Sequence, residues 1–157
     1  TPLTAADFIL GYLLPILPIA LAQSVICYAV AAVLGLRITV NVLYAVLLML
    51  PVSLFFIAVG LLCGSMLNVK QVGGICGALF TNLSAWLSGT WFDLELVGGA
   101  FKKIAYALPF VHAVELERAA LNGNFSDILP NLIWVLCYAA VAVALAVWLF
   151  LRQMKRQ

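Results

Sequence analysis

The residues of this chain that could do acid–base chemistry are few, and three of them cluster near position 115. His112, Glu115 and Arg118 are spaced three residues apart, so on a helix they lie along one side. The simplest interpretation of that spacing is a solvated helix side with local ion pairs. His112 is the only histidine, so a catalytic triad or a histidine metal centre would lack partners. We therefore expect no catalytic residue and no metal ligand in this chain.

A second group of polar residues is uncharged and lies inside long apolar stretches. Gln23, Ser24, Asn82 and Ser84 belong to this group. Polar groups deep in a membrane need partners and often line a pathway, although hydrogen bonds between packed helices are the alternative. We predict that Gln23, Asn82 and Ser84 line a translocation pathway.

These polar residues must be positioned by long apolar elements, because the sequence is 66% hydrophobic and only 9% charged. Soluble domains carry about 25% charged residues. The stretches 8–34, 42–64, 72–92 and 128–151 contain no charged residue, and each is close to the roughly 20 residues that cross a bilayer as a helix. The sequence predicts an all-α, polytopic membrane helix bundle with four transmembrane helices, forming a single domain over 1–157. No basic run suggests nucleic acid as a partner.

The segment 93–127 differs from the four stretches because it holds five of the six acidic residues. An amphipathic pattern runs from 111 to 121, after a break at Pro109 and before an Asn122-Gly123 stop signal. We expect a re-entrant, amphipathic helical insert on the extracellular side, before the last span.

The third apolar stretch carries small residues at helical spacing. We name this set the small-residue stripe; it comprises Gly74, Gly77, Thr81, Ser84 and Ser88. Membrane helices pack closely through such small residues. The stripe therefore predicts close packing against another helix.

Charge at the chain ends gives an expected orientation. An even number of spans puts both ends on one side, and Arg152, Lys155 and Arg156 crowd the last few residues. Basic residues beside a span favour the cytoplasm. We expect a multi-pass protein of the cytoplasmic membrane, with both termini of this chain in the cytoplasm.

Three runs of the sequence, in this order, resemble the ABC-2 type permease family. They are TPLTAADFILG at 1–11, SGTWF at 88–92 and LPFVHAVELERAALNG at 108–123. The resemblance implies that the four spans are the family's third to sixth helices. We accordingly expect the chain to begin inside a longer protein. The absence of a starting methionine agrees with this expectation.

The resemblance also implies partners and roles. Segment 1–7 would be the coupling segment that touches an ABC ATPase subunit, through Pro2, Leu3, Thr4 and Asp7. ATP and Mg²⁺ would be bound by that ATPase, so this chain would bind no cofactor and would not be an enzyme. A second permease copy would complete a dimer among membrane lipids. The family further implies a polar outer gate, for which His112, Glu115 and Arg118 are the candidates.

The function that follows is the permease component of an ATP-driven exporter of a lipophilic or amphipathic substrate. A fragment of a secondary transporter is one alternative, although no charged residue lies inside the four stretches. A non-transporting membrane anchor or immunity protein is another, but such a protein would need neither a coupling segment nor a structured insert.

Overall fold

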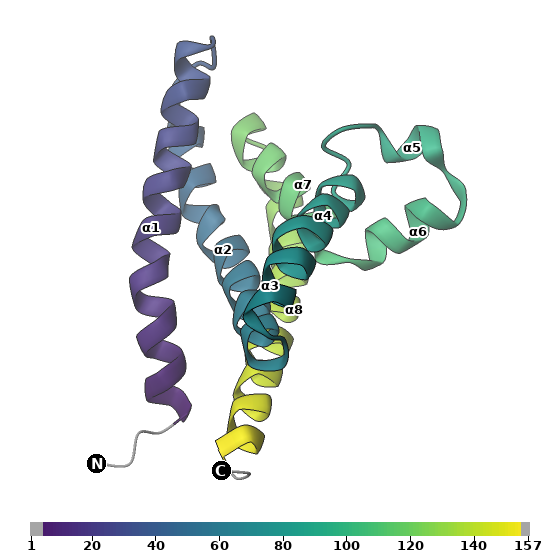
Figure 1. Ribbon diagram of the computed structural model, residues 1–157. Helices are drawn as coiled ribbons and strands as arrows, with labels where there is room; N and C mark the ends of the chain where they lie inside the picture. The colour runs from purple at the N-terminus through teal and green to yellow at the C-terminus, as the bar shows by residue number, and fades with distance from the viewer. Residues whose placement is uncertain (1–4, 155–157) are drawn as a thin grey trace.

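Three long helices dominate the computed structural model, which describes residues 5–154 (Figure 1). They are α1 (Ala5–Val33), α2 (Val40–Met66) and α8 (Phe125–Met154), and each is long and apolar enough to cross a membrane. The described residues form helices and no strand, which confirms the predicted all-α class. The helices predicted at 8–34, 42–64 and 128–151 are present, each with its ends shifted by one to three residues.

The predicted third span takes a different form. Three consecutive pieces replace it: α3 (Val69–Val72), the π-helix η1 (Gly73–Phe80) and α4 (Thr81–Leu87). The Thr81 hydroxyl donates to the carbonyl of Cys76, five residues earlier, at 3.1 Å. Glycines at 73, 74 and 77 weaken the α-helical preference here, and π turns appear mostly as short irregularities within α-helices.

The end of that span was predicted too late, at residue 92. The helical run stops at Leu87, and residues 88–92 form a turn. Gly89 adopts a positive φ of 69° there, a left-handed conformation that residues with a Cβ rarely take. Leu94 also blocks this position, because an added Cβ on Gly89 would lie 3.1 Å from its side chain.

The insert contains three helices: α5 (Leu94–Val97), α6 (Gly99–Ala107) and α7 (Pro109–Asn122). Proline occupies the first turn of α7, where its missing N–H costs nothing. Gly123 ends α7 with a left-handed φ of 71°. The amphipathic helix predicted at 111–121 is therefore confirmed, and Pro109 and Gly123 set its limits.

Helix α7 is built into the core of the bundle. Its Leu116 is fully buried and packs against Val52 of α2 and Val135 of α8. Phe110, the second residue of α7, packs against Phe55 of α2 with ring centroids 6.2 Å apart. The helix thus fixes the position of its polar side chains relative to both spans.

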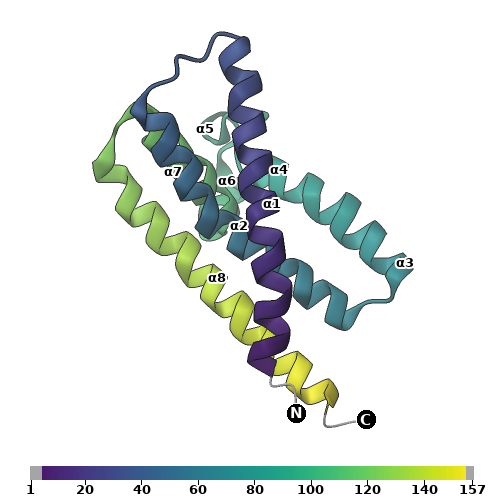
Figure 2. The same cartoon turned by 90° about the vertical axis from the view of Figure 1, so that its left-hand side faces the viewer.

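The chain direction alternates from one long element to the next (Figures 1 and 2). The start of α1 and the end of α8 lie at the same end of the molecule, which we call the terminal end. The α1–α2 and α7–α8 connections lie at the opposite end. Asn41, at the start of α2, donates to the carbonyl of Leu121 near the end of α7 at 3.1 Å, so the two connections are joined directly.

Candidate translocation site

Three adjoining cavities follow α1 and α2, and together we call them the α1–α2 groove. The first, of about 640 Å³, is lined at the terminal end by residues including Tyr12 and Gly64. The second, of about 500 Å³, contains Gln23 and Ser24 in its lining. The third, of about 520 Å³, is lined by α4 and α7 as well as by α1 and α2. Neighbouring cavities share wall residues; these are Ile16, Tyr28, Met49, Val52, Phe56 and Ile57.

Two of the three predicted pathway residues lie on this groove. Gln23 lines the second cavity and Ser84 lines the third. Asn82 lines none of the three cavities, and its amide donates to the carbonyl of Ala78 on the adjoining η1 at 2.7 Å. The structure therefore brings Gln23 and Ser84 to one groove and leaves Asn82 outside it.

Glu117 of α7 lies in the third cavity and was missed by the sequence analysis. The hydroxyl of Tyr28 on α1 donates to its Oε2 at 2.9 Å. Its other oxygen, Oε1, is buried and has no hydrogen-bond partner among the described residues. Burial raises the pKa of the Glu117 carboxyl above its ordinary value, and the Tyr28 hydrogen bond opposes that rise only in part.

A helical wheel could have found Glu117. Phe110, Val114 and Leu121 lie three, four or seven residues from it, on the same side of α7. All three apolar residues line the third cavity together with Glu117. A single carboxylate within an apolar helix side is the signal that the sequence contained.

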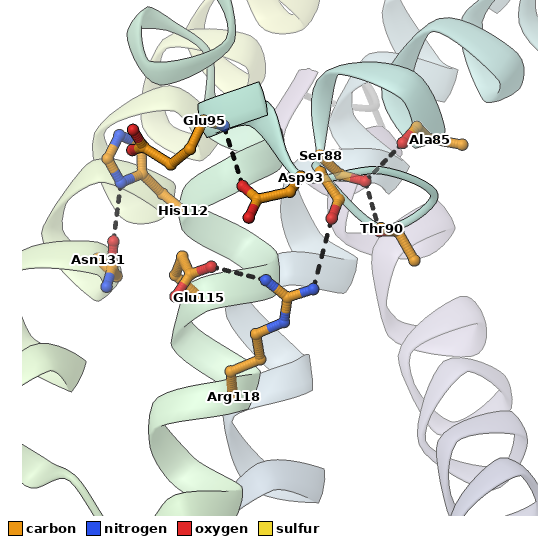
Figure 3. A network of polar contacts seen from close by, with 10 residues as sticks. Ala85, Ser88, Thr90, Asp93, Glu95, His112, Glu115, Arg118 and Asn131 are labelled. Atoms are coloured by element: carbon orange, nitrogen blue, oxygen red, sulfur yellow. Dashed lines mark hydrogen bonds and ion pairs between the residues drawn. The ribbon is translucent and has the colours of Figure 1, made fainter. Parts of the chain in front are cut away.

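Two of the three predicted gate residues contact each other, as Figure 3 shows. Arg118 donates from Nη1 to Glu115 Oε1 at 2.8 Å and from Nη2 to the carbonyl of Gly89 at 3.4 Å. These contacts connect α7 to the turn that follows α4. Both side chains of the ion pair are about half exposed, so solvent screens the pair and it contributes about 1 kcal/mol or less.

His112 faces α8 instead (Figure 3). Its ring stacks on Trp134 at 4.8 Å, Nδ1 lies 2.8 Å from Asn131 Oδ1, and Nε2 lies 3.0 Å from the Tyr106 carbonyl. The amide of Asn131 donates from Nδ2 to the Asp127 carbonyl, which leaves Oδ1 toward the histidine. Both ring nitrogens thus lie within hydrogen-bond distance of an oxygen atom.

The three predicted gate residues nevertheless line one polar cavity. It has a volume of about 400 Å³ and lies at the end of the molecule opposite the chain termini. Asn124, Asp127 and Asn131 complete its polar wall. No group of three or more His, Cys, Asp or Glu side chains in residues 5–154 is arranged to hold a metal ion.

Of the predicted coupling residues, only Asp7 lies in the described part of the chain. It falls in the first turn of α1, at the terminal end. Pro2, Leu3 and Thr4 lie outside the described residues.

The family model of the ABC-2 type transporter matches residues 1–122 of this chain. The match extends from the first residue to the end of α7 and covers most of the sequence. The chain therefore belongs to the ABC-2 type transporter family, whose membrane domains are transport components and not enzymes. No curated protein and no solved structure gives a significant match.

Proposed function

We propose that this chain is the permease part of an ATP-driven exporter, with ATP and Mg²⁺ bound by a separate ABC ATPase subunit or domain. The family supports the transport role. The observation that carries the proposal is the α1–α2 groove, which follows two helices of membrane-spanning length. Because its walls are mostly apolar, the substrate is lipophilic or amphipathic, such as a drug, lipid, peptide or polymer.

The run α3–η1–α4 is, in this proposal, the fourth crossing. Its residues 69–87 come close to the length that a bilayer requires. Lys70 lies in α3, at the start of this run, and Arg152 lies in the last turn of α8, at the terminal end. We place this end in the cytoplasm, because basic residues favour that side. The insert then re-enters the cytoplasmic membrane from the outside, and α7 packs between the spans.

The proposed cycle begins at segment 1–7. When the ATPase subunits close, they push on this coupling segment, which contains Pro2, Leu3, Thr4 and Asp7. The groove then changes from an inward-open to an outward-open form. Different substrate affinities in the two forms give the transport its direction.

The outer gate consists, in this cycle, of His112, Glu115 and Arg118. A gate must open at small cost in free energy. The exposed Glu115–Arg118 pair meets this condition, because it contributes little to stability. The contacts of His112 with Asn131 and Trp134 keep this part of α7 fixed to α8 while the Glu115–Arg118 pair separates.

A second permease copy completes the pathway in our proposal. The small-residue stripe supports this, because an added Cβ at Gly74 or Gly77 would meet no atom within 4 Å. The stripe is therefore not covered at these positions by any described residue of this chain, and we assign this surface to the partner copy.

One experiment tests the exporter proposal directly. The full-length permease and its ATPase are reconstituted in liposomes, and transport of candidate lipophilic substrates is followed with and without ATP. We expect uptake into inside-out vesicles to require ATP and to stop when the ATPase is inactivated by mutation. Transport that continues with the inactive ATPase would contradict the proposal.

The buried Glu117 favours one alternative, a secondary transporter, because such proteins use buried acidic groups for coupling ions. A protonophore separates the two functions. An ATP-driven exporter keeps its transport rate when the proton gradient is collapsed, whereas a proton-coupled carrier loses it.

A further inference from the structure

The third cavity of the groove combines apolar walls with Glu117, whose Oε1 has no hydrogen-bond partner among the described residues. Its aromatic side chains come from three different helices: Tyr28 from α1, Phe56 from α2 and Phe110 from α7. Its volume of about 520 Å³ is within the range that encloses a small organic molecule. A ligand of this size would contact apolar surface on most sides and one acceptor.

The orientation of Glu117 is fixed on one side only. Tyr28 holds Oε2 by its hydrogen bond of 2.9 Å, so the carboxylate points from α7 toward α1. Oε1 is buried without a partner among the described residues. An ionised carboxylate in this position is unfavourable until a donor reaches Oε1.

The neighbouring side chains do not supply that donor. Helix α2 contributes only Met49, Val52 and Phe56 to the wall. The hydroxyls of Thr81 and Ser84 on α4 donate to the carbonyls of Cys76 and Thr81. Those of Ser88 and Thr90 hydrogen-bond to each other, and Ser88 also donates to the carbonyl of Ala85. Arg118 is the other charged residue in the lining, but its guanidinium donates to Glu115 and to the Gly89 carbonyl. Among the described residues, Glu117 therefore forms no ion pair with a cation of the cavity wall.

We propose that this cavity binds amphipathic cations, in which a protonated amine donates to Oε1 of Glu117 and an apolar body packs against Phe56 and Phe110. A neutral hydroxyl would complete the hydrogen bond but leave the buried charge uncompensated, whereas an ammonium group does both. Aromatic rings around the site add attraction for a cation. The inference rests on the proposed function, because it names the substrate class of the same groove.

The test measures binding without ATP. The full-length protein is placed in phosphatidylcholine nanodiscs, which carry no net charge, and titrated with dansylcadaverine. This probe joins a primary amine to an apolar fluorescent ring system. Its N-acetylated form has nearly the same shape and no charge. We expect the acetylated probe to bind at least about tenfold more weakly, the effect of losing one charge-assisted hydrogen bond.

Glu117→Gln isolates the charge, because glutamine has nearly the same size and shape. We expect it to weaken binding of dansylcadaverine about tenfold or more and to leave the acetylated probe unchanged. Glu95→Gln is the matched control, since Glu95 is an exposed carboxylate on α5 that pairs with Lys102. It should change neither affinity by more than about twofold. Equal effects of the two variants, or no effect of Glu117→Gln, would overturn the proposal.

A second variant tests the cavity if Glu117→Gln fails to fold. Ala85 of α4 lines the same cavity and takes no part in the hydrogen bond between Tyr28 and Glu117. Ala85→Leu fills the space, so binding of dansylcadaverine should fall at least about tenfold, and unchanged binding would refute the site.

The site and the exporter proposal fail in different experiments. Charge-dependent binding together with transport that ignores ATP would refute the exporter and keep the site. ATP-driven transport that Glu117→Gln leaves unchanged for cationic and neutral substrates alike would refute the site and keep the exporter.

Discussion

The apolar run α3–η1–α4 is less buried than helix α7, although α7 carries more charged residues. The third stretch carries the small-residue stripe and long apolar side chains, yet none of the residues of α3, η1 or α4 is buried. Helix α7 carries two glutamates and an arginine, yet seven of its residues are buried. In a membrane, an apolar surface can face lipid at no cost, so apolar character alone does not indicate the core.

The same comparison applies to the polar side chains. On α4, Asn82 donates to the Ala78 carbonyl of the adjoining η1 and Ser84 to the Thr81 carbonyl, so both hydrogen bonds stay within the α3–η1–α4 run. On α7, Glu117 contacts α1 and His112 contacts α8. Of these two regions, it is therefore α7 whose polar side chains connect different helices.

The largest expected difference between the two regions concerns packing. Leu116→Ala on α7 should lower the free energy of unfolding by about 2–5 kcal/mol, because the fully buried side chain leaves a cavity between α2 and α8. Leu79→Ala on η1 is the control, since that side chain is 57% exposed; we expect less than about 1 kcal/mol. Thermal unfolding in detergent measures both, and equal losses would contradict the burial difference.

Glu117→Gln should raise stability at alkaline pH by about 1–3 kcal/mol, because the neutral amide does not carry the desolvation cost of an ionised carboxylate with an unpartnered oxygen. The folded protein has the raised carboxyl pKa, so it keeps this proton to higher pH than the unfolded chain. Wild-type stability therefore falls as pH rises from the ordinary glutamate range through the raised pKa. The stability gain of Glu117→Gln should disappear at pH values below the ordinary pKa range of glutamate.

The pH profile of unfolding is the measurement, with Glu115→Gln as the matched control on the same helix. Glu115 accepts a hydrogen bond from Arg118 and is half exposed. Its replacement should give no gain at alkaline pH. A gain of equal size in both variants would show that net charge, and not the buried position of Glu117, is responsible.

A smaller effect is expected where α7 ends. Gly123→Ala should destabilise the protein by about 1–2 kcal/mol, because its φ of 71° strains any residue with a Cβ. The added Cβ would also lie 3.1 Å from the Asn41 amide. Asn41→Ala should cost about 0.5–1.5 kcal/mol through its lost hydrogen bond to Leu121. If both variants have the thermal stability of the wild type, the α1–α2 and α7–α8 connections are not joined through Asn41.

The smallest predicted change in the free energy of unfolding is a stabilisation, at Gly77 of the small-residue stripe. Gly77→Ala should stabilise a monomer in detergent by about 0.5–1 kcal/mol, because alanine favours a helix and no atom lies within 4 Å of its Cβ. If a second copy covers the stripe, the added methyl group should also lower the dimer fraction measured by chemical cross-linking. Destabilisation of the monomer itself would show that the chain covers its own stripe.

Some helix limits could be predicted from the sequence and others could not. The apolar stretches predicted three long helices to within three residues, because a bilayer requires about 20 apolar residues and a charge cannot enter cheaply. Pro109 and Gly123 fixed the limits of α7 through backbone geometry alone. By contrast, the third helix ends at Leu87, before a turn in which Gly89 has a positive φ of 69°, and the apolar pattern that continues to residue 92 does not show this end.

The sequence by itself therefore determined the class of protein, the extent of its long helices and the side of α7 on which each polar residue lies. Only the tertiary structure decided that Glu117 faces a cavity and leaves one oxygen without a partner. Its contact, Tyr28, lies 89 residues away along the chain. Helical periodicity acts over a few residues and sets the direction of a side chain, whereas the environment of that side chain depends on which distant helix packs against it.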